Sequence, residues 1–250
     1  MSWDWLEVAQ ALGAEREVVC MDMRGFGESD WSADKDYSVP SMAQDIASVL
    51  DHLGWKRAVL FGHSMGGRST TFFAARNPQR AAALALLDYT PENAPAGTKR
   101  TTELVGNTPD SFHSLEAARE YLGKKKSLER YKHYLKDLSV KRDPYFRDQF
   151  RKVLAGGERP KLGVDMWQLI AEVRCPILSV RGARSDMYAP DTVAKMKAAN
   201  PRLEVAEIDA GHDLAGDNPV DLLAVLTRFL ERLDHEEFRR GLTPILGAKP

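Results

Sequence analysis

Short apolar runs alternate along this chain with longer stretches in which apolar residues recur every three or four positions. These short runs predict strands over residues 17–21, 57–61, 82–87, 176–180 and 203–208, with 17–21, 57–61 and 176–180 expected to be buried. The longer stretches predict helices over residues 3–12, 41–53, 68–76, 191–199 and 220–233. Strands that alternate with helices indicate an α/β fold, with a mostly parallel sheet flanked by helices on both faces. In such a sheet, sites lie beyond the carboxyl ends of the strands.

The stretch from 91 to 166 breaks this alternation, because it is polar, helical in pattern and without a convincing strand. We therefore expect a helical cap at residues 91–166, inserted into a core formed by residues 1–90 and 167–235. Residues 236–250 are charged and then rich in glycine and proline, and we expect them to form a peripheral C-terminal tail.

The junction between the second predicted strand and the helix after it contains a Gly-x-Ser-x-Gly motif centred on Ser64. This motif at a strand-to-helix junction is typical of a nucleophile elbow, where a strained turn exposes the serine hydroxyl. We expect Gly62 and Gly66 to lie where strand and helix approach too closely for a Cβ atom. Gly67 would let the helix start close to the sheet.

A serine hydroxyl becomes an effective nucleophile when a base takes its proton and an acid orients that base. Asp186 follows the predicted strand 176–180, and His212 follows the strand 203–208. Both would therefore lie at the same edge of the sheet as Ser64, in the chain order expected for this fold type. We predict a catalytic triad of Ser64, His212 and Asp186.

Two other polar residues compete for these roles. Asp88 ends the predicted strand 82–87 and is an alternative acid, although the residues after it are also typical of a simple turn. His63 adjoins the nucleophile, but adjacent residues on a strand face opposite ways, which favours a structural role for it.

Together these motifs resemble the α/β-hydrolase superfamily, specifically its esterase- and lipase-like members with a helical cap. The matching segments are Asp22-x-Arg24-Gly25-x-Gly27-x-Ser29, Gly62-His63-Ser64-Met65-Gly66-Gly67, Gly182-x-x-Ser185-Asp186 and Gly211-His212. The resemblance implies that Ser64 forms an acyl-enzyme, while His212 acts first as general base and then as general acid. It also implies that Asp186 orients His212 and that the Met65 backbone N–H donates to the oxyanion, helped by the positive end of its helix.

Several apolar residues near the motif turns and the cap junctions are candidates for the wall of an acyl pocket, although core packing accounts for each equally well. They are Phe26, Trp167, Met187, Tyr188 and Leu214.

The resemblance also shows a deficit. Members of the superfamily carry a His-Gly turn after a strand that precedes the first helix, and this turn supplies a second oxyanion donor. The strand and its turn have no counterpart here, which leaves a gap between the predicted strands 17–21 and 57–61 that backbone hydrogen bonds cannot bridge. Three explanations are open: a start downstream of the true one, direct pairing of these two strands, or another chain in the gap.

Loss of one oxyanion donor typically lowers turnover by about 10²–10³. The resemblance therefore implies a serine hydrolase of impaired activity that acts on a small carboxylic ester or a related acyl bond. Carbon–carbon bond hydrolysis and cofactor-free perhydrolysis are alternatives on the same triad. A truncated or non-catalytic binding protein with an inherited triad is an alternative of another class. An exposed sheet edge at the missing strand would favour a homo-oligomer.

The composition limits the classes of partner that the protein is expected to bind. The 250 residues are 43% hydrophobic and 28% charged with a net charge of −1, which gives no argument for nucleic acid or membrane binding. The amino terminus lacks the pattern of a signal peptide, and we expect both cysteines, Cys20 and Cys175, to be reduced thiols in buried strands. We therefore expect a cytoplasmic protein. No Cys/His spacing resembles a zinc site, and neither a metal nor an organic cofactor is implied.

One region departs from this neutral balance. Residues 121–152 carry eleven Lys and Arg against four Asp and Glu. A basic cap would attract an anionic substrate, although a solvated helical surface is the simpler explanation.

Overall fold

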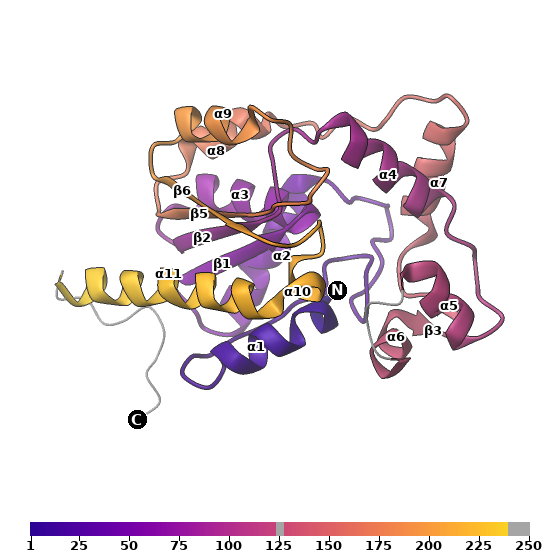
Figure 1. The fold of residues 1–250 in the computed structure, drawn as a ribbon, viewed down its shortest axis with the longest axis horizontal. Coiled ribbons are helices and arrows are strands. Elements are labelled where there is room, and N and C mark those ends of the chain that lie inside the picture. Colours follow the sequence, from indigo (N-terminus) through magenta and orange to yellow (C-terminus); the bar gives the residue numbers. More distant parts are fainter. Residues whose placement is uncertain (124–127, 240–250) are drawn as a thin grey trace.

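A parallel sheet of four strands forms the centre of the protein. The computed structural model describes residues 1–123 and 128–239 (Figure 1). In these residues the strand order is β1-β2-β5-β6, with the bounds β1 Ala58–His63, β2 Ala81–Leu87, β5 Ile177–Gly182 and β6 Leu203–Ile208. The register sets the end of β1 opposite that of β2 and the end of β5 opposite that of β6. The carboxyl ends of the strands therefore meet at one edge, as the sequence predicts.

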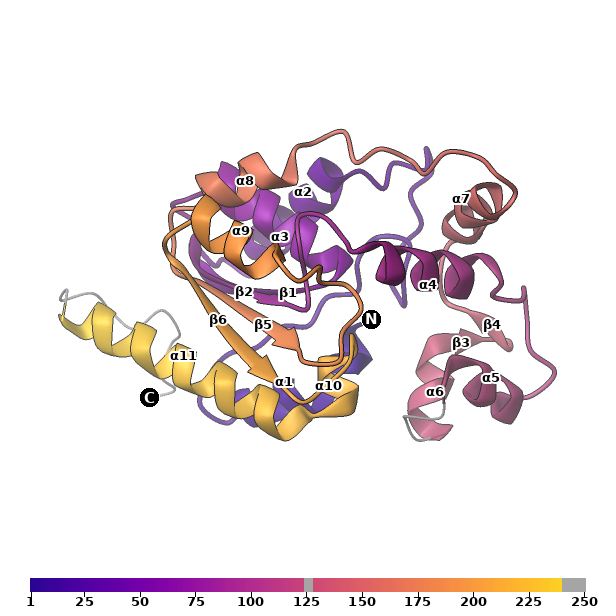
Figure 2. The same cartoon turned by 45° about the horizontal axis from the view of Figure 1, so that its top comes forward.

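Helices cover both faces of this sheet (Figures 1 and 2). One face carries α2 Val39–His52, α3 Met65–Arg76, α8 Met166–Glu172 and α9 Thr192–Ala199. The other face carries the 3-10 helix η1 Ser2–Trp5 and the helices α1 Leu6–Leu12, α10 Leu214–Asp217 and α11 Pro219–Arg239. Two separate apolar clusters fill the space between the sheet and these layers. The expected α/β class is confirmed.

The strand β2 is buried along its whole length because it lies between β1 and β5 and under helices on both faces. Its sequence, seven alanines and leucines, leaves no polar side chain to satisfy in that position. The first polar side chain at the carboxyl end of β2 is therefore that of the next residue, Asp88.

The residues from 95 to 154, called here the inserted segment, lie to one side of the sheet (Figures 1 and 2). Their helices are α4 Pro95–Gly106, α5 Leu115–Leu122, α6 Leu128–Tyr134 and α7 Pro144–Leu154. The expectation that this region has no strand is wrong, since β3 Leu135–Lys136 and β4 Ser139–Val140 form an antiparallel hairpin. Its two turn residues, Asp137 and Leu138, both have positive φ, which is the turn geometry that matches the twist of a two-residue hairpin.

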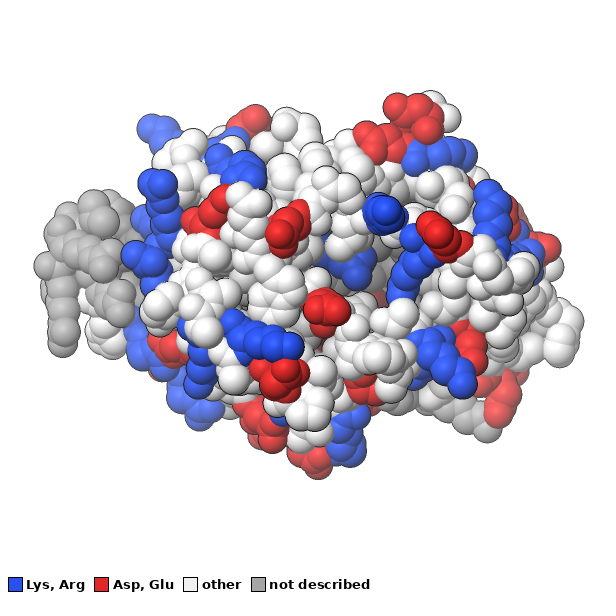
Figure 3. Space-filling model, turned by 90° about the horizontal axis from the view of Figure 1, so that it is seen from above, with Lys and Arg blue, Asp and Glu red and all other residues white. Residues whose placement is uncertain are grey.

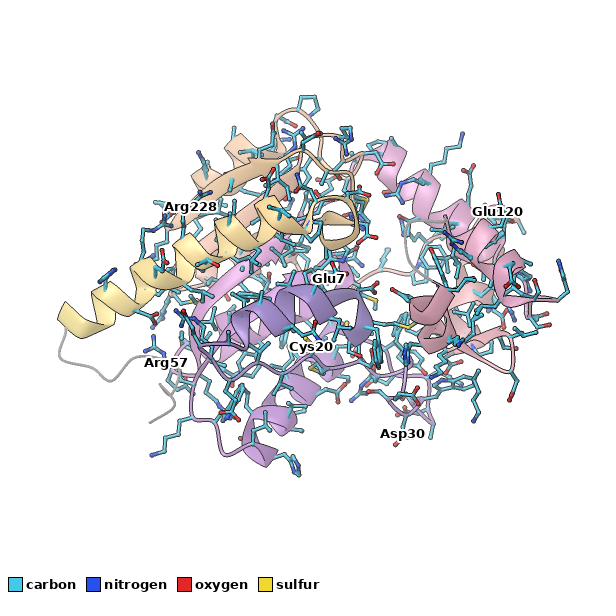
Figure 4. The ribbon with its side chains drawn as sticks, turned by 60° about the horizontal axis from the view of Figure 1, so that its bottom comes forward. Glu7, Cys20, Asp30, Arg57, Glu120 and Arg228 are labelled. Atoms are coloured by element: carbon cyan, nitrogen blue, oxygen red, sulfur yellow. The ribbon has the colours of Figure 1, made fainter. Side chains whose placement is uncertain are left out.

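The predicted strand at residues 17–21 is absent. These residues have no assigned secondary structure and belong to no sheet, and within residues 1–123 and 128–239 β1 is an edge strand that pairs only with β2. Val19 is 46% exposed, and Cys20, expected to be buried, is also exposed. Figure 4 shows Cys20 beside α1, on the segment that leads away from that helix. Direct pairing of the two strands is therefore wrong, because a cavity, described below, lies between them.

The C-terminal tail expected over residues 236–250 begins as part of a helix. The helix α11 continues to Arg239, and residues 240–250 lie outside the described residues. None of the helices in the described ranges combines the length and the apolar character that a bilayer span requires.

Candidate active site

Ser64 lies on the turn between β1 and α3 with φ 51° and ψ −116°. A non-glycine residue in this region of backbone space is strained, and such strain persists only where surrounding contacts hold it. The Ser64 backbone N–H donates to the carbonyl of Leu87 over 3.2 Å, which ties the turn to the end of β2. The geometry is that of a nucleophile elbow, as the motif predicts.

Two glycines make this turn possible. A Cβ on Gly62 would lie 2.7 Å from the carbonyl oxygen of Gly66, and a Cβ on Gly67 would lie 2.7 Å from the Cβ of Tyr89. The expected close approach is therefore confirmed at Gly62 and Gly67. It is wrong for Gly66, where an added Cβ would meet the Met23 sulfur at an ordinary contact distance of 3.9 Å.

His212 joins the nucleophile to a carboxylate. Its Nε2 lies 3.0 Å from Ser64 Oγ, and its Nδ1 lies 2.7 Å from Asp88 Oδ2. When Nδ1–H donates to Asp88, the lone pair on Nε2 faces the serine hydroxyl and accepts its proton. The arrangement can therefore activate Ser64 for attack on an acyl carbon.

The carboxylate at His212 is not the predicted one. Asp88 is fully buried and also accepts hydrogen bonds from the Gly182 backbone N–H, over 3.0 Å, and from Ser185 Oγ, over 2.5 Å. Asp186 instead forms a two-pronged ion pair with Arg100 of α4, with Nε–Oδ2 2.7 Å and Nη2–Oδ1 2.8 Å. The structure therefore corrects the predicted pairing of Asp186 with His212.

The strand order gives the physical reason. Asp88 follows β2, which is the immediate neighbour of β1, whereas Asp186 follows β5, one strand farther from Ser64. Ser185 uses its hydroxyl on Asp88, so the next residue, Asp186, projects toward the inserted segment. The hydrogen bond from Arg100 holds the pKa of the Asp186 carboxyl below its ordinary value.

His63 supports His212 from the other side. Its Nε2 lies 2.8 Å from the His212 backbone carbonyl oxygen, and its ring packs edge-on against Trp5. Removal from water, together with the neighbouring His212 ring, lowers the pKa of His63 to about 4. His63 is therefore neutral near pH 7 and donates to the backbone beside the base, which agrees with the structural role expected for it.

A cavity of about 640 Å³ runs from Ser64 and Met65 to the space between β1 and residues 16–21. Phe26 lines it, as expected of a pocket wall, and so do Leu104 and Arg142 of the inserted segment. The other expected wall residues pack in the two apolar clusters instead: Trp167, Met187 and Tyr188 in one, Leu214 in the other. The core-packing interpretation therefore holds for these four.

Two residues at the site have no signal in the sequence. Arg100 reaches Asp186 because the start of α4 is held on the Asp186 turn, and Leu104 lines the cavity from farther along the same helix. Ser185 had a signal, since it lies within the Gly182-x-x-Ser185-Asp186 motif. The motif alone does not show that its serine, and not its aspartate, contacts the carboxylate of the triad.

The basic residues of the inserted segment have mostly structural contacts. Arg147 pairs with Asp110, and Lys141 pairs with Glu28. Arg151 donates to the backbone carbonyl of Gly106 over 3.0 Å. Lys124, Lys125 and Lys126, which contribute to the predicted basic balance, lie outside the described residues. The described part of the segment therefore offers less free positive charge than its composition predicts.

The model of the alpha/beta hydrolase fold family matches residues 1–162. The chain belongs to this family.

Relatives of this alpha/beta hydrolase include hydrolases of known reaction. It is 29% identical to the 3-hydroxybutyrate-oligomer hydrolase of Cupriavidus necator, over 84% of this chain and 78% of the relative. It is 27% identical to the N-formylmaleamate deformylase of Pseudomonas putida, over 92% of this chain and 84% of the relative. Its fold superimposes on the crystal structure of E-2-(acetamidomethylene)succinate hydrolase with a TM-score of 0.77 at 23% identity, covering 92% and 87% of the two chains.

Proposed function

We propose that this protein is a serine hydrolase that cleaves a small carboxylic ester or a related acyl bond through an acyl-enzyme on Ser64. The observation that carries the proposal is the continuous chain of hydrogen bonds from Ser64 through His212 to Asp88. In this proposal Asp88 takes the orienting role first expected of Asp186.

The steps follow from the positions of the protons. Ser64 Oγ attacks the acyl carbon while His212 Nε2 takes its proton, and the imidazolium then gives that proton to the leaving group. Asp88 stabilises the imidazolium through the hydrogen bond to Nδ1. A water molecule, activated by the same nitrogen, then releases the acid from Ser64 and restores the serine.

Stabilisation of the oxyanion is the weaker part of the proposed machinery. The Met65 backbone N–H lies at the start of α3, where the helix dipole adds positive potential. Met23 lines the cavity beside it, and a thioether has no proton to donate to an oxyanion. With Met65 as the one assigned donor, turnover would fall about 10²–10³ below that of a site with two donors.

The relatives and the inserted segment indicate the kind of substrate. The names of the two curated relatives denote hydrolysis of a 3-hydroxybutyrate oligomer and of N-formylmaleamate, both of which are carboxylic acids. We propose that residues 91–166 act as a cap over the site, because Leu104 and Arg142 of that region line the cavity that reaches Ser64. The proposed substrate is a small acyl compound that carries an anionic group.

Covalent labelling by a neutral fluorophosphonate tests the nucleophile. We expect the folded wild-type protein to be labelled at Ser64, and the Ser64→Ala variant to remain unlabelled. His212→Ala should abolish labelling, whereas His63→Ala should retain most of it. Absence of labelling in the folded wild-type protein would contradict the proposal. An equal loss of labelling in His212→Ala and His63→Ala would contradict the assignment of His212 as the base.

A further inference from the structure

The ion pair between Arg100 and Asp186 lies at the junction of the inserted segment and the core. Both partners are partly open to water, with the side chain of Arg100 42% exposed and that of Asp186 32% exposed. Seen from above, the surface is hollowed between the core and the inserted segment, with basic side chains on the walls of the hollow (Figure 3). A ligand can therefore approach this pair from solvent.

Asp186 does not use all the donors of the guanidinium. Nε and Nη2 of Arg100 bond to the carboxylate, and Nη2 also lies 3.6 Å from the Met187 sulfur. Nη1 makes no hydrogen bond to any of the described residues. One edge of the guanidinium is thus fixed by Asp186, and its outer nitrogen remains free to donate.

This guanidinium is connected to the triad through one turn of the backbone. The backbone N–H of Gly97 donates to the carbonyl of Asp186 over 3.0 Å, so the start of α4 is anchored on the turn that carries Ser185. Ser185 in turn donates to Asp88, the partner of His212. The pair and the triad therefore share one turn of backbone.

The position of Arg100 on α4 also supports a connection with the active site. Leu104 lies four residues after Arg100, so both side chains are on one face of α4. Leu104 lines the cavity that contains Ser64 and Met65, and Arg100 lies outside that lining, one helical turn before Leu104. The charge of Asp88 also contributes, after the larger effect of Asp186, to the raised pKa of Arg100. Arg100 and the triad are thus within electrostatic reach of each other.

We propose that Arg100 binds a carboxylate on the substrate through its free Nη1, and that Asp186 positions the guanidinium for this contact. The proposal rests on the proposed function and names the substrate as an acyl compound with a carboxylate away from the scissile bond. A guanidinium suits this task because it stays charged and presents several donors in a rigid plane. Asp186 fixes that plane, but its negative charge also weakens the attraction for an anionic substrate.

The two partners of the pair should therefore act in opposite directions. The test compares two esters of similar length, mono(4-nitrophenyl) glutarate, which is anionic, and 4-nitrophenyl pentanoate, which is neutral. The readout is the ratio of kcat/KM for the anionic ester to that for the neutral one. We expect Arg100→Gln to lower this ratio about 10- to 100-fold, as loss of a charge-assisted hydrogen bond would. Asp186→Asn should raise it about 3- to 10-fold, since the amide oxygen still accepts from the guanidinium while a nearby like charge is removed.

Two further variants control for folding and for general charge. Arg100→Lys keeps the charge but loses the planar fork, so its ratio should lie between those of the wild type and Arg100→Gln. Lys99→Gln removes a positive charge from the same helix, but Lys99 is 78% exposed and pairs only loosely with Glu103. Its ratio should equal that of the wild type.

A purely structural latch gives a different pattern. Because Arg100→Gln and Asp186→Asn break the same ion pair, a latch would shift the ratio in the same direction in both variants, or leave it unchanged in both. Either result would overturn the proposal.

Titration with glutarate separates this proposal from the proposed function. It is carried out on the Ser64→Ala protein with and without Arg100→Gln, so it needs no turnover. We expect glutarate to bind about 10-fold more weakly when Arg100 is replaced. Equal affinities would overturn the role of Arg100 even if the wild-type protein hydrolyses esters. Weaker binding would support it even if Ser64 proves unreactive.

Discussion

The turns that follow β2 and β5 look alike in the sequence, but the structure uses their carboxylates differently. Each turn places an aspartate beyond an apolar strand, at the same edge of the sheet. Asp88 is fully buried and accepts hydrogen bonds from three groups, whereas Asp186 is partly exposed and bonds to one arginine. The comparison shows that the end of a strand determines which region of the molecule a side chain occupies. Its burial and the direction in which it points then determine which groups it contacts.

The backbone of the first turn explains part of this difference. Asp88 has φ 43°, a left-handed conformation that aspartate tolerates better than most residues. This conformation accompanies a side chain directed at the Gly182 N–H and at His212. A buried carboxylate is stable only when its oxygens are satisfied by such donors.

The largest expected effect on stability comes from replacing Asp88, and Asp186 is its matched comparison. Asp88→Asn should lower the free energy of unfolding by about 2 kcal/mol, because charge-assisted hydrogen bonds are lost in a buried site. Asp186→Asn should lower it by less than about 1 kcal/mol, since its partner is exposed and screened by water. Chemical denaturation of both variants measures the difference, and equal losses would show that the two turns are alike in energy as well as in sequence.

A smaller effect is expected from the residue that links the two turns. Ser185→Ala removes one donor from Asp88 but leaves those from Gly182 and His212. We expect the free energy of unfolding to fall by about 1–2 kcal/mol. Ester hydrolysis should slow by about 10-fold, because losing a contact that stabilises the position of Asp88 by about 1.4 kcal/mol raises the barrier by a similar amount. Stability and activity that both match the wild type would show that Ser185 contributes nothing to the position of Asp88.

An effect that is confined to low pH concerns the support that His63 gives to His212 opposite Asp88. Because the folded pKa of His63 is about 4, below its ordinary value of 6.5, the unfolded chain binds a proton more readily between these values. The contribution of neutral His63 is fully present above pH 6.5 and is lost as the pH falls toward 4. As the pH is lowered from 6.5 to 4, the midpoint temperature of thermal unfolding should therefore fall less steeply in His63→Gln than in the wild type. His52→Gln, which replaces an exposed histidine, should keep the wild-type slope; equal slopes in all three proteins would contradict this account of His63.

Most of the fold could be predicted because its signals are local. The runs that became β1, β2, β5 and β6 lie in a covered parallel sheet, and the central strand β2 is apolar throughout, whereas β6 carries Glu204 and Glu207 between its apolar residues. Residues 17–21 carry the same local signal, but a strand also needs a partner, and the cavity beside β1 separates them from one. No local pattern reports the absence of a neighbour.

The site residues likewise fall into those that local motifs predict and those that depend on long-range contacts. Ser64 and His212 lie in motifs whose turns are specified by nearby residues. The choice between Asp88 and Asp186 depends instead on strand order and on the arginine that α4 brings to the site from the inserted segment. These are contacts between residues far apart in the chain, which spacing along the sequence does not encode.

The central claim is that Asp88, and not Asp186, orients His212 for the activation of Ser64. The most direct test is the rate at which a neutral fluorophosphonate labels Ser64 in the wild type, in Asp88→Asn and in Asp186→Asn. Asparagine at position 88 would favour the wrong tautomer of His212, a change that costs about 10⁴ in rate in a serine protease triad. We predict that Asp88→Asn slows labelling at least about 100-fold more than Asp186→Asn does. Equal slowing, or greater slowing in Asp186→Asn, would contradict the account.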